Sequence, residues 1–105
     1  MLNNPEDQKL VTLALATLKR SGAKQAAALR DNTGRTYVAV AVDSSSLVLD
    51  AVEAVFTVAM ASQINGIEAV VFSGERSAKT AVISEFAPTA AIFFANDGAV
   101  PDKIA

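Results

Sequence analysis

Residues 67–95 read IEAVVFSGERSAKTAVISEFAPTAAIFFA, and the pattern of this stretch indicates the α/β class of fold. Its two continuous apolar runs, at 67–72 and 90–95, are typical of short strands buried on both faces of a sheet. Between them, RSAKTAVISEF at 76–86 predicts a short helix, which Pro88 ends because a proline disfavours helical backbone in the residue before it. Two buried strands joined through a helix indicate a right-handed crossover with the strands parallel.

A helix and a hairpin are predicted before this unit. Residues 4–22 predict the helix, since they run from an asparagine N-cap and a proline to a terminating glycine. The hairpin is predicted from KQAAALR at 24–30 and the β-branched RTYVAVAV at 35–42, which flank the turn sequence DNTG at 31–34. We therefore expect a mixed sheet, with an antiparallel hairpin followed by the parallel pair.

The stretch LVLDAVEAVFTVAM at 47–60 predicts a second helix, which ends near Asn65-Gly66. The preceding DSSS at 43–46 breaks the strand before it and offers hydroxyl groups for an N-cap. This helix is apolar almost all round, and such a helix is buried in the middle of a domain or at a subunit interface. A last short strand is expected at Ala99-Val100.

Composition narrows the classes of function. The chain has 105 residues, which suits a single α/β domain spanning 1–105, and its net charge of −2 comes without a basic stripe, which argues against nucleic-acid binding. The sequence lacks an apolar run of the roughly 18 residues that a membrane-spanning helix needs. The opening MLNNPEDQ has acids where a secretory signal has bases, so we expect a cytoplasmic protein without membrane association.

Cysteine and histidine are both absent from the sequence. Their absence excludes disulfides, thiol nucleophiles, imidazole bases and every Cys/His zinc arrangement. Catalysis would have to come from carboxylates, lysines, hydroxyls or a bound cofactor. The serines at 44–46 have no histidine to activate them, and we interpret them as a cap for the helix that follows.

The run SEFAPTAAIFFANDGAV at 84–100 resembles the C-terminal part of cytidine deaminases, in which a helix end of the type A-E-F-A-P precedes a strand and a turn like N-x-D-G. TGRTY at 33–37, followed by VAVAV, similarly resembles the D-G-x-x-Y hairpin that leads into the V-N-V-E strand of that family. The resemblance covers residues 8–100. It implies the three-layer cytidine deaminase-like fold, an α/β architecture in which helices cover both faces of a mixed sheet.

Zinc deaminases hold their metal through a His or Cys, followed two residues later by a catalytic Glu, and through a later P-C-x-x-C pair. The metal activates a water, and the Glu moves protons between that water and the base. By this resemblance, the first ligand position is Ala51 and the proton-shuttle position is retained as Glu53. The other two ligand positions are Arg76 and Lys79. The resemblance therefore implies lost zinc ligands, and we expect neither a metal nor another cofactor.

The resemblance implies further losses around the substrate. The Asn and Glu that hold the ribose in the family's V-N-V-E strand correspond to Val40 and Val42. The aromatic residue that stacks on the base falls near Ala23. Each change removes a polar or stacking group that a nucleoside would need. The chain thus resembles a deaminase fold from which the chemistry has been removed.

Two carboxylates remain near the lost site. We hypothesise that Arg76 or Lys79 occupies the space of the metal and pairs with Glu53, since a buried carboxylate needs a partner or a proton. Asp50 is explained by its place near the start of the predicted helix, where the dipole favours negative charge. Asp50 and Glu53 alone supply too few oxygens for Ca²⁺ or Mg²⁺.

These features predict a catalytically inactive cytidine deaminase-like protein that acts as an oligomeric or partner-binding module. The apolar helix from Leu47 to Ala61 is expected to join copies into a homodimer or tetramer, or to bind a protein partner. Two alternatives stay open. One is a binder of a nucleoside-like ligand in a remodelled pocket, and the other, ranked last, is a metal-free enzyme that uses Glu53 with Lys79.

Overall fold

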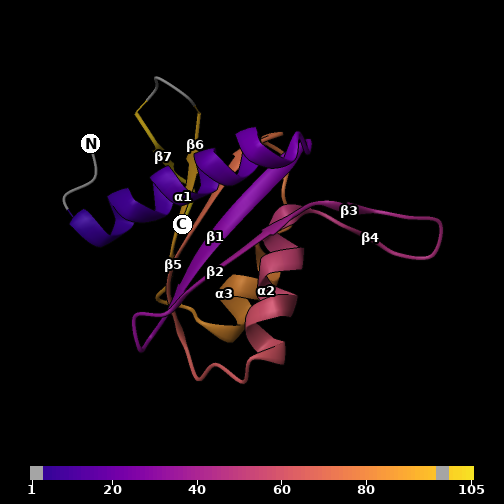
Figure 1. The fold of residues 1–105 in the computed structure, drawn as a ribbon. Coiled ribbons are helices and arrows are strands. Elements are labelled where there is room, and N and C mark those ends of the chain that lie inside the picture. The colour runs from indigo at the N-terminus through magenta and orange to yellow at the C-terminus, as the bar shows by residue number, and fades with distance from the viewer. Residues whose placement is uncertain (1–3, 97–99) are drawn as a thin grey trace.

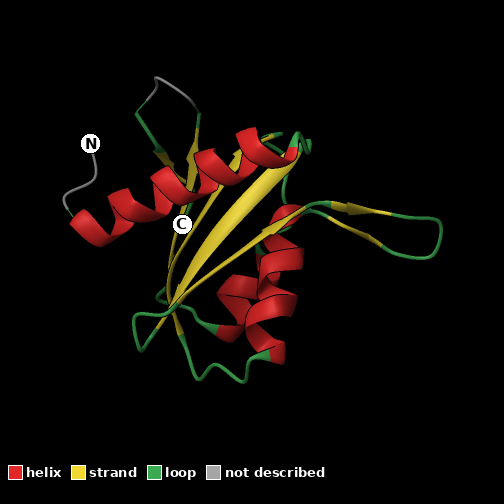
Figure 2. Cartoon of the chain, viewed as in Figure 1, coloured by secondary structure: helices red, strands yellow, loops and turns green. Residues whose placement is uncertain are grey.

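The computed structural model describes residues 4–96 and 100–105 (Figures 1 and 2). Its elements are α1 (Pro5–Ser21), β1 (Gln25–Asp31), β2 (Thr36–Val40), β3 (Val42–Asp43), β4 (Val48–Leu49), α2 (Ala51–Ala61), β5 (Ile67–Gly74), α3 (Ala81–Phe86), β6 (Ala91–Ala95) and β7 (Asp102–Lys103). Five strands form one sheet in the order β2-β1-β5-β6-β7. β5 and β6 are parallel, and the other neighbours in this sheet are antiparallel. The predicted mixed sheet is therefore confirmed.

Helices cover both faces of this sheet, with α1 on one face and α2 and α3 on the other (Figure 1). Successive side chains of a strand point to opposite faces. Ala69 and Val71 of β5 accordingly join the core beneath α1, whereas Val70 and Phe72 join the core beneath α2 and α3. The expected three-layer α/β architecture is confirmed.

The first helix forms as the sequence predicts. The Asn4 side chain accepts a hydrogen bond from the backbone N–H of Glu6 at 2.8 Å, and Gly22 takes a φ of 68° at the C-cap. α1 has 17 residues; its buried apolar residues are Leu10, Val11 and Ala14, and it has acidic residues in its first turn and basic residues in its last. Within the described ranges, the structure contains no helix long and apolar enough to cross a membrane.

The turn between β1 and β2 is held by the buried Asp31. Its Oδ1 accepts hydrogen bonds from the backbone N–H groups of Thr33 at 2.8 Å and Arg35 at 3.0 Å. Its Oδ2 accepts one from the Tyr37 hydroxyl at 3.3 Å. Burial acting alone would raise the pKa of the Asp31 carboxyl, but the hydrogen bond that the Thr33 hydroxyl donates to Oδ1 at 2.7 Å, together with the three bonds above, holds that pKa below its ordinary value. The hairpin predicted from this turn is confirmed.

The second helix begins later than predicted, and the expected start at Leu47 is wrong. Residues 42–49 instead form a hairpin arm, made of β3, β4 and their connecting turn, that projects from the body (Figure 1). The Ser44 hydroxyl donates to the Leu47 carbonyl at 3.0 Å and accepts from the Leu47 backbone N–H at 3.1 Å. Ser44 thus closes the turn of the arm instead of capping a helix. Asp50 is the N-cap, and α2 starts at Ala51.

The third helix is shorter than predicted, because α3 begins at Ala81 and not at residue 76. Backbone groups of residues 75–79 are hydrogen-bonded to the side chains of Gln25 and Asp50 and not to one another. These contacts from outside the segment replace the local bonds that a helix would make.

The last strand also differs from the sequence prediction. β7 is formed by Asp102 and Lys103, which pair with Phe94 and Phe93 of β6. Val100 belongs to no strand. The other residue of the expected strand, at position 99, lies outside the described residues.

Candidate functional site

The zinc-ligand and proton-shuttle positions implied by the resemblance lie in two segments that meet at one end of the sheet. Ala51 and Glu53 are in the first turn of α2, whereas Arg76 and Lys79 are in the irregular segment 75–80 between β5 and α3. The two segments are joined directly, because Asp50 Oδ2 accepts a hydrogen bond from the backbone N–H of Lys79 at 2.7 Å. The fold therefore brings the start of α2 and this segment together.

The two carboxylates at the start of α2 form a capping box. Asp50 Oδ1 accepts a hydrogen bond from the backbone N–H of Glu53 at 2.8 Å, and Glu53 Oε1 accepts one from the backbone N–H of Asp50 at 3.0 Å. Each side chain satisfies a donor that a helix N-terminus leaves without an internal partner. Asp50 therefore lies at the start of the helix, as the sequence predicts, and its position is that of the N-cap.

Arg76 and Lys79 do not lie where the hypothesis of an ion pair with Glu53 would place them. Arg76 Nη2 lies 2.7 Å from Asp102 Oδ2, and the guanidinium carbon lies 4.7 Å from the centre of the Phe94 ring. Lys79 is exposed and contributes its backbone N–H rather than its ammonium group. Within residues 4–96 and 100–105, Glu53 forms no ion pair with either cation. The partner of its carboxylate is a backbone N–H group.

A residue that the sequence interpretation overlooked lies between the two segments. Gln25, at the start of β1, is only 2% exposed. Its Oε1 accepts a hydrogen bond from the backbone N–H of Ala51 at 2.8 Å. Its Nε2 donates to the carbonyls of Glu75 at 2.6 Å and Ser77 at 3.0 Å. A long polar side chain directly before the apolar run AAAL at 26–29 was the available signal, since a buried amide requires hydrogen-bond partners.

The residues at the three ligand positions do not fit zinc. Zinc is held by thiolate sulfur, imidazole nitrogen or carboxylate oxygen. Ala51 presents a fully buried methyl group, while Arg76 and Lys79 carry cationic groups without a free lone pair. Across the described part of the chain, no group of three or more His, Cys, Asp or Glu side chains is arranged to hold a metal ion. The chemistry of this donor set excludes the metal site that the resemblance implies for active deaminases.

The positions related to nucleoside binding are likewise apolar. Val40 is half-buried in β2, and Val42 is half-buried in β3 at the base of the arm. Ala23 is half-buried between α1 and β1. None of these three side chains can donate or accept a hydrogen bond, and none has a ring to stack on a base. These three side chains therefore cannot supply the polar and stacking contacts that the resemblance implies for active deaminases.

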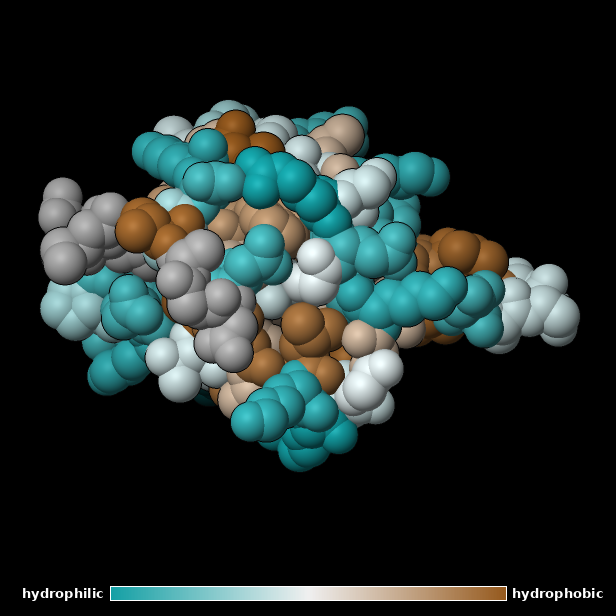
Figure 3. Space-filling view, turned by 90° about the horizontal axis from the view of Figure 1, so that it is seen from above, coloured by the Kyte–Doolittle hydropathy of each residue, from teal (hydrophilic) through white to brown (hydrophobic). Residues whose placement is uncertain are grey.

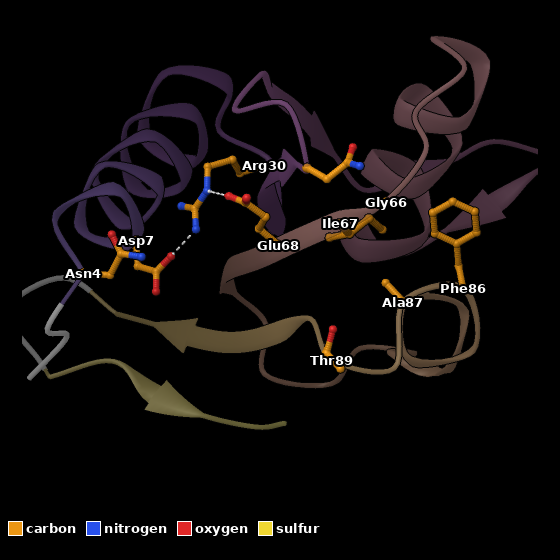
Figure 4. Close-up of a pocket in the computed structure, with 10 residues that line it drawn as sticks. Asn4, Asp7, Arg30, Gly66, Ile67, Glu68, Phe86, Ala87 and Thr89 are labelled. Carbon is orange, nitrogen blue, oxygen red and sulfur yellow. Dashed lines mark hydrogen bonds and ion pairs between the residues drawn. The ribbon is translucent and has the colours of Figure 1, made fainter.

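A separate polar cavity of about 650 Å³ lies near the opposite end of β5 (Figure 4). The buried Arg30 lies between two carboxylates there, with its Nε 2.7 Å from Glu68 Oε1 and its Nη2 2.8 Å from Asp7 Oδ1. Burial would lower the pKa of the Arg30 guanidinium, but these two partners together raise it above its ordinary value. The network ties α1 to β1 and β5 through two of the three guanidinium nitrogens. Within the described residues, the third nitrogen, Arg30 Nη1, is buried and has no hydrogen-bond partner.

No curated protein matches the chain. The family model described as "Cytidine deaminase-like" matches residues 3–99, which is nearly the whole chain. The resemblance carried by the 33–37 hairpin and the 84–100 run is therefore confirmed at the level of the family. The chain belongs to the cytidine deaminase-like family.

Proposed function

We propose that this chain is a catalytically inactive cytidine deaminase-like domain that acts in the cytoplasm as an oligomeric or partner-binding module. The observation that carries the proposal is the chemistry at the three ligand positions. A buried methyl group, a guanidinium paired with Asp102 and an exposed lysine cannot replace the three zinc ligands of a deaminase. Without zinc ligands there would be no metal to activate a water for Glu53, and its carboxylate accepts a hydrogen bond at the N-terminus of α2.

Metal content and turnover test the inactive state. We expect the purified chain to contain no stoichiometric zinc by elemental analysis and to release no ammonia from cytidine, with or without added Zn²⁺. Stoichiometric zinc, or cytidine turnover that is lost in Glu53→Gln, would refute the proposal. A nucleoside panel followed by thermal shift covers the ligand-binding alternative, because a ligand at 100 times its Kd stabilises a protein by about 2.7 kcal/mol.

Apolar side chains on the arm and the outer side of α2 support a binding role. Leu47 and Val48 of the arm are 51% and 69% exposed, and Val58 and Met60 of α2 are 43% and 37% exposed. Figure 3 shows hydrophobic side chains on the part of the molecule that projects from the body. Burying one such side chain completely would contribute roughly 1.5–3 kcal/mol, so a few of them are enough to stabilise a symmetric contact.

Sedimentation analysis tests self-association with a matched pair of variants. Val48→Lys places a charge on the arm, while Val100→Lys places the same charge on another valine that is similarly exposed, at 66%. We expect the parent and Val100→Lys to sediment as the same oligomer and Val48→Lys to shift towards monomer. A monomeric parent at all concentrations would refute self-association, and it would leave a protein partner as the object of a pull-down with the same two variants.

A further inference from the structure

The segments that carry the three former ligand positions must be held together in some other way. In a zinc deaminase, ligands from the start of one helix and from a second segment converge on a single metal ion. Metal binding of this kind contributes directly to folding free energy, because the ligands are far apart in the unfolded chain. A chain that has lost those ligands loses this cross-link as well.

Gln25 makes its contacts with the same two segments. The Ala51 N–H that it binds belongs to the first residue of α2, and the carbonyls of Glu75 and Ser77 lie on either side of Arg76. A glutamine amide has two N–H donors and one carbonyl acceptor. Here the acceptor is used once and the Nε2 group binds two carbonyls, so this buried amide is satisfied entirely by backbone groups.

Backbone contacts on both sides hold Gln25 in this position. Its carbonyl accepts a hydrogen bond from the Ala41 N–H at 3.0 Å, and the Glu75 N–H donates to the Lys24 carbonyl at 2.9 Å. Gly74, opposite Gln25 in the sheet, has a φ of 100° and lets β5 turn sharply into segment 75–80. A Cβ atom at Gly74 would lie 2.3 Å from the Lys24 carbonyl oxygen, so only glycine allows this close approach.

Asp50 adds a second connection between the segments. Its Oδ1 caps α2 through Glu53, while its Oδ2 accepts the hydrogen bond from the Lys79 N–H. Gln25 and Asp50 together therefore bind the backbone of two former ligand residues, Ala51 and Lys79, and the residues on either side of the third. We define these two side chains as the Gln25–Asp50 clamp.

We propose that the Gln25–Asp50 clamp replaces the metal as the cross-link between α2 and segment 75–80. The clamp works with backbone groups and so does not depend on which side chains stand at positions 51, 76 and 79. It holds the two segments together through the Gln25 amide and the Asp50 carboxylate. The inference rests on hydrogen bonds within this chain and would stand even if the proposed binding role failed.

Hydrogen exchange and urea unfolding of Gln25 variants test the clamp. Gln25→Ala removes all three side-chain hydrogen bonds and leaves their buried partners unsatisfied, so we expect its unfolding equilibrium constant to rise at least tenfold. Gln8→Ala is the matched control, because Gln8 is exposed on α1, and it should change that constant less than threefold. The Ala51 amide should lose protection in Gln25→Ala, whereas the Val71 amide in the core should keep its protection at the same relative level.

Gln25→Glu separates the two halves of the clamp and keeps the test open if Gln25→Ala does not fold. A glutamate retains an acceptor for the Ala51 N–H but replaces the Nε2 donor with an oxygen, which faces the carbonyls of Glu75 and Ser77. We expect protection of the Ala51 amide to persist while the Glu75 and Lys79 amides exchange faster. Equal stability of Gln25→Ala and Gln8→Ala, or unchanged exchange at all three amides in Gln25→Glu, would overturn the proposal. So would a loss of stability of the parent on chelator treatment, since it would show that a metal is the cross-link.

Discussion

Replacing Asp50 with alanine is expected to weaken two parts of the fold at once. Asp50 caps α2 by accepting the Glu53 N–H at 2.8 Å, and it also accepts the Lys79 N–H at 2.7 Å. Loss of an N-cap side chain costs about 0.5–2 kcal/mol. A hydrogen bond to a charged group contributes about 1.5–3 kcal/mol, and the lower end applies here because Asp50 is only half-buried. We therefore expect Asp50→Ala to lower the free energy of unfolding by about 2–4 kcal/mol.

Urea unfolding at neutral pH, followed by circular dichroism, measures this loss. Because about 1 kcal/mol shifts Tm by roughly 4–8 °C in a domain of this size, a thermal scan should show a fall of at least about 8 °C. Asp50→Asn should lose less, since asparagine is an equally good N-cap and retains one acceptor oxygen. The matched control is Asp43→Ala on the arm, where the carboxylate is exposed.

The comparison of these variants shows whether Asp50 both caps α2 and binds the Lys79 N–H group. Asp43→Ala should remain within about 0.5 kcal/mol of the parent, as surface substitutions usually do. If Asp50→Ala and Asp43→Ala unfold at the same urea concentration, then neither the cap nor the Lys79 contact contributes measurably, and the reasoning is refuted. If Asp50→Asn loses as much as Asp50→Ala, the cap contributes little and the contact with Lys79 accounts for the stabilisation.

Three further predictions concern charges elsewhere in the fold. Arg30→Ala should lower the free energy of unfolding in urea by about 3–5 kcal/mol, because it leaves the Asp7 carboxylate buried without its partner. Glu68→Ala should lower it clearly less, because the Glu68 carboxylate is half-exposed. The pKa of the Asp31 carboxyl is lowered in the folded state, so its contribution to stability is present above the ordinary pKa of 3.8 and is lost as pH falls below that value. The stability advantage of the parent over Asp31→Asn should therefore shrink as pH falls below 3.8. A stability difference that stays constant with pH would contradict this assignment. Arg76→Ala should change stability by only about 0–1 kcal/mol, since its ion pair with Asp102 is exposed; a loss comparable to that of Arg30→Ala would mean that Arg76 has a buried partner.

The elements with strong local signals could be predicted well. The cap and glycine of α1, the DNTG turn and the apolar runs at 67–72 and 90–95 each determine backbone conformation through nearby residues. The start of α2 was missed because Ser44 could serve either as a helix cap or as a turn residue. Its hydrogen bonds with Leu47 in the arm show which of the two local structures forms.

The partner of Glu53 could not be predicted from spacing alone. Arg76 and Lys79 are the cations nearest to it in the family register, but the Arg76 side chain reaches Asp102, which lies near the end of the chain. That contact depends on β7 pairing with β6, a long-range event that leaves no local trace in the sequence. Glu53 is satisfied instead by a bond only three residues away.

The class of fold and the family could be inferred from the sequence alone, and the sequence also shows that cysteine and histidine are absent. Apolar periodicity, turn chemistry and the identity of side chains at given positions are properties of the chain that need no three-dimensional information. The contacts between the start of α2 and segment 75–80 become visible in three dimensions, because Gln25 binds Ala51, Glu75 and Ser77 across long stretches of sequence. A buried amide requires hydrogen-bond partners, and the packing of β1 against β5 and α2 determines which backbone groups those partners are.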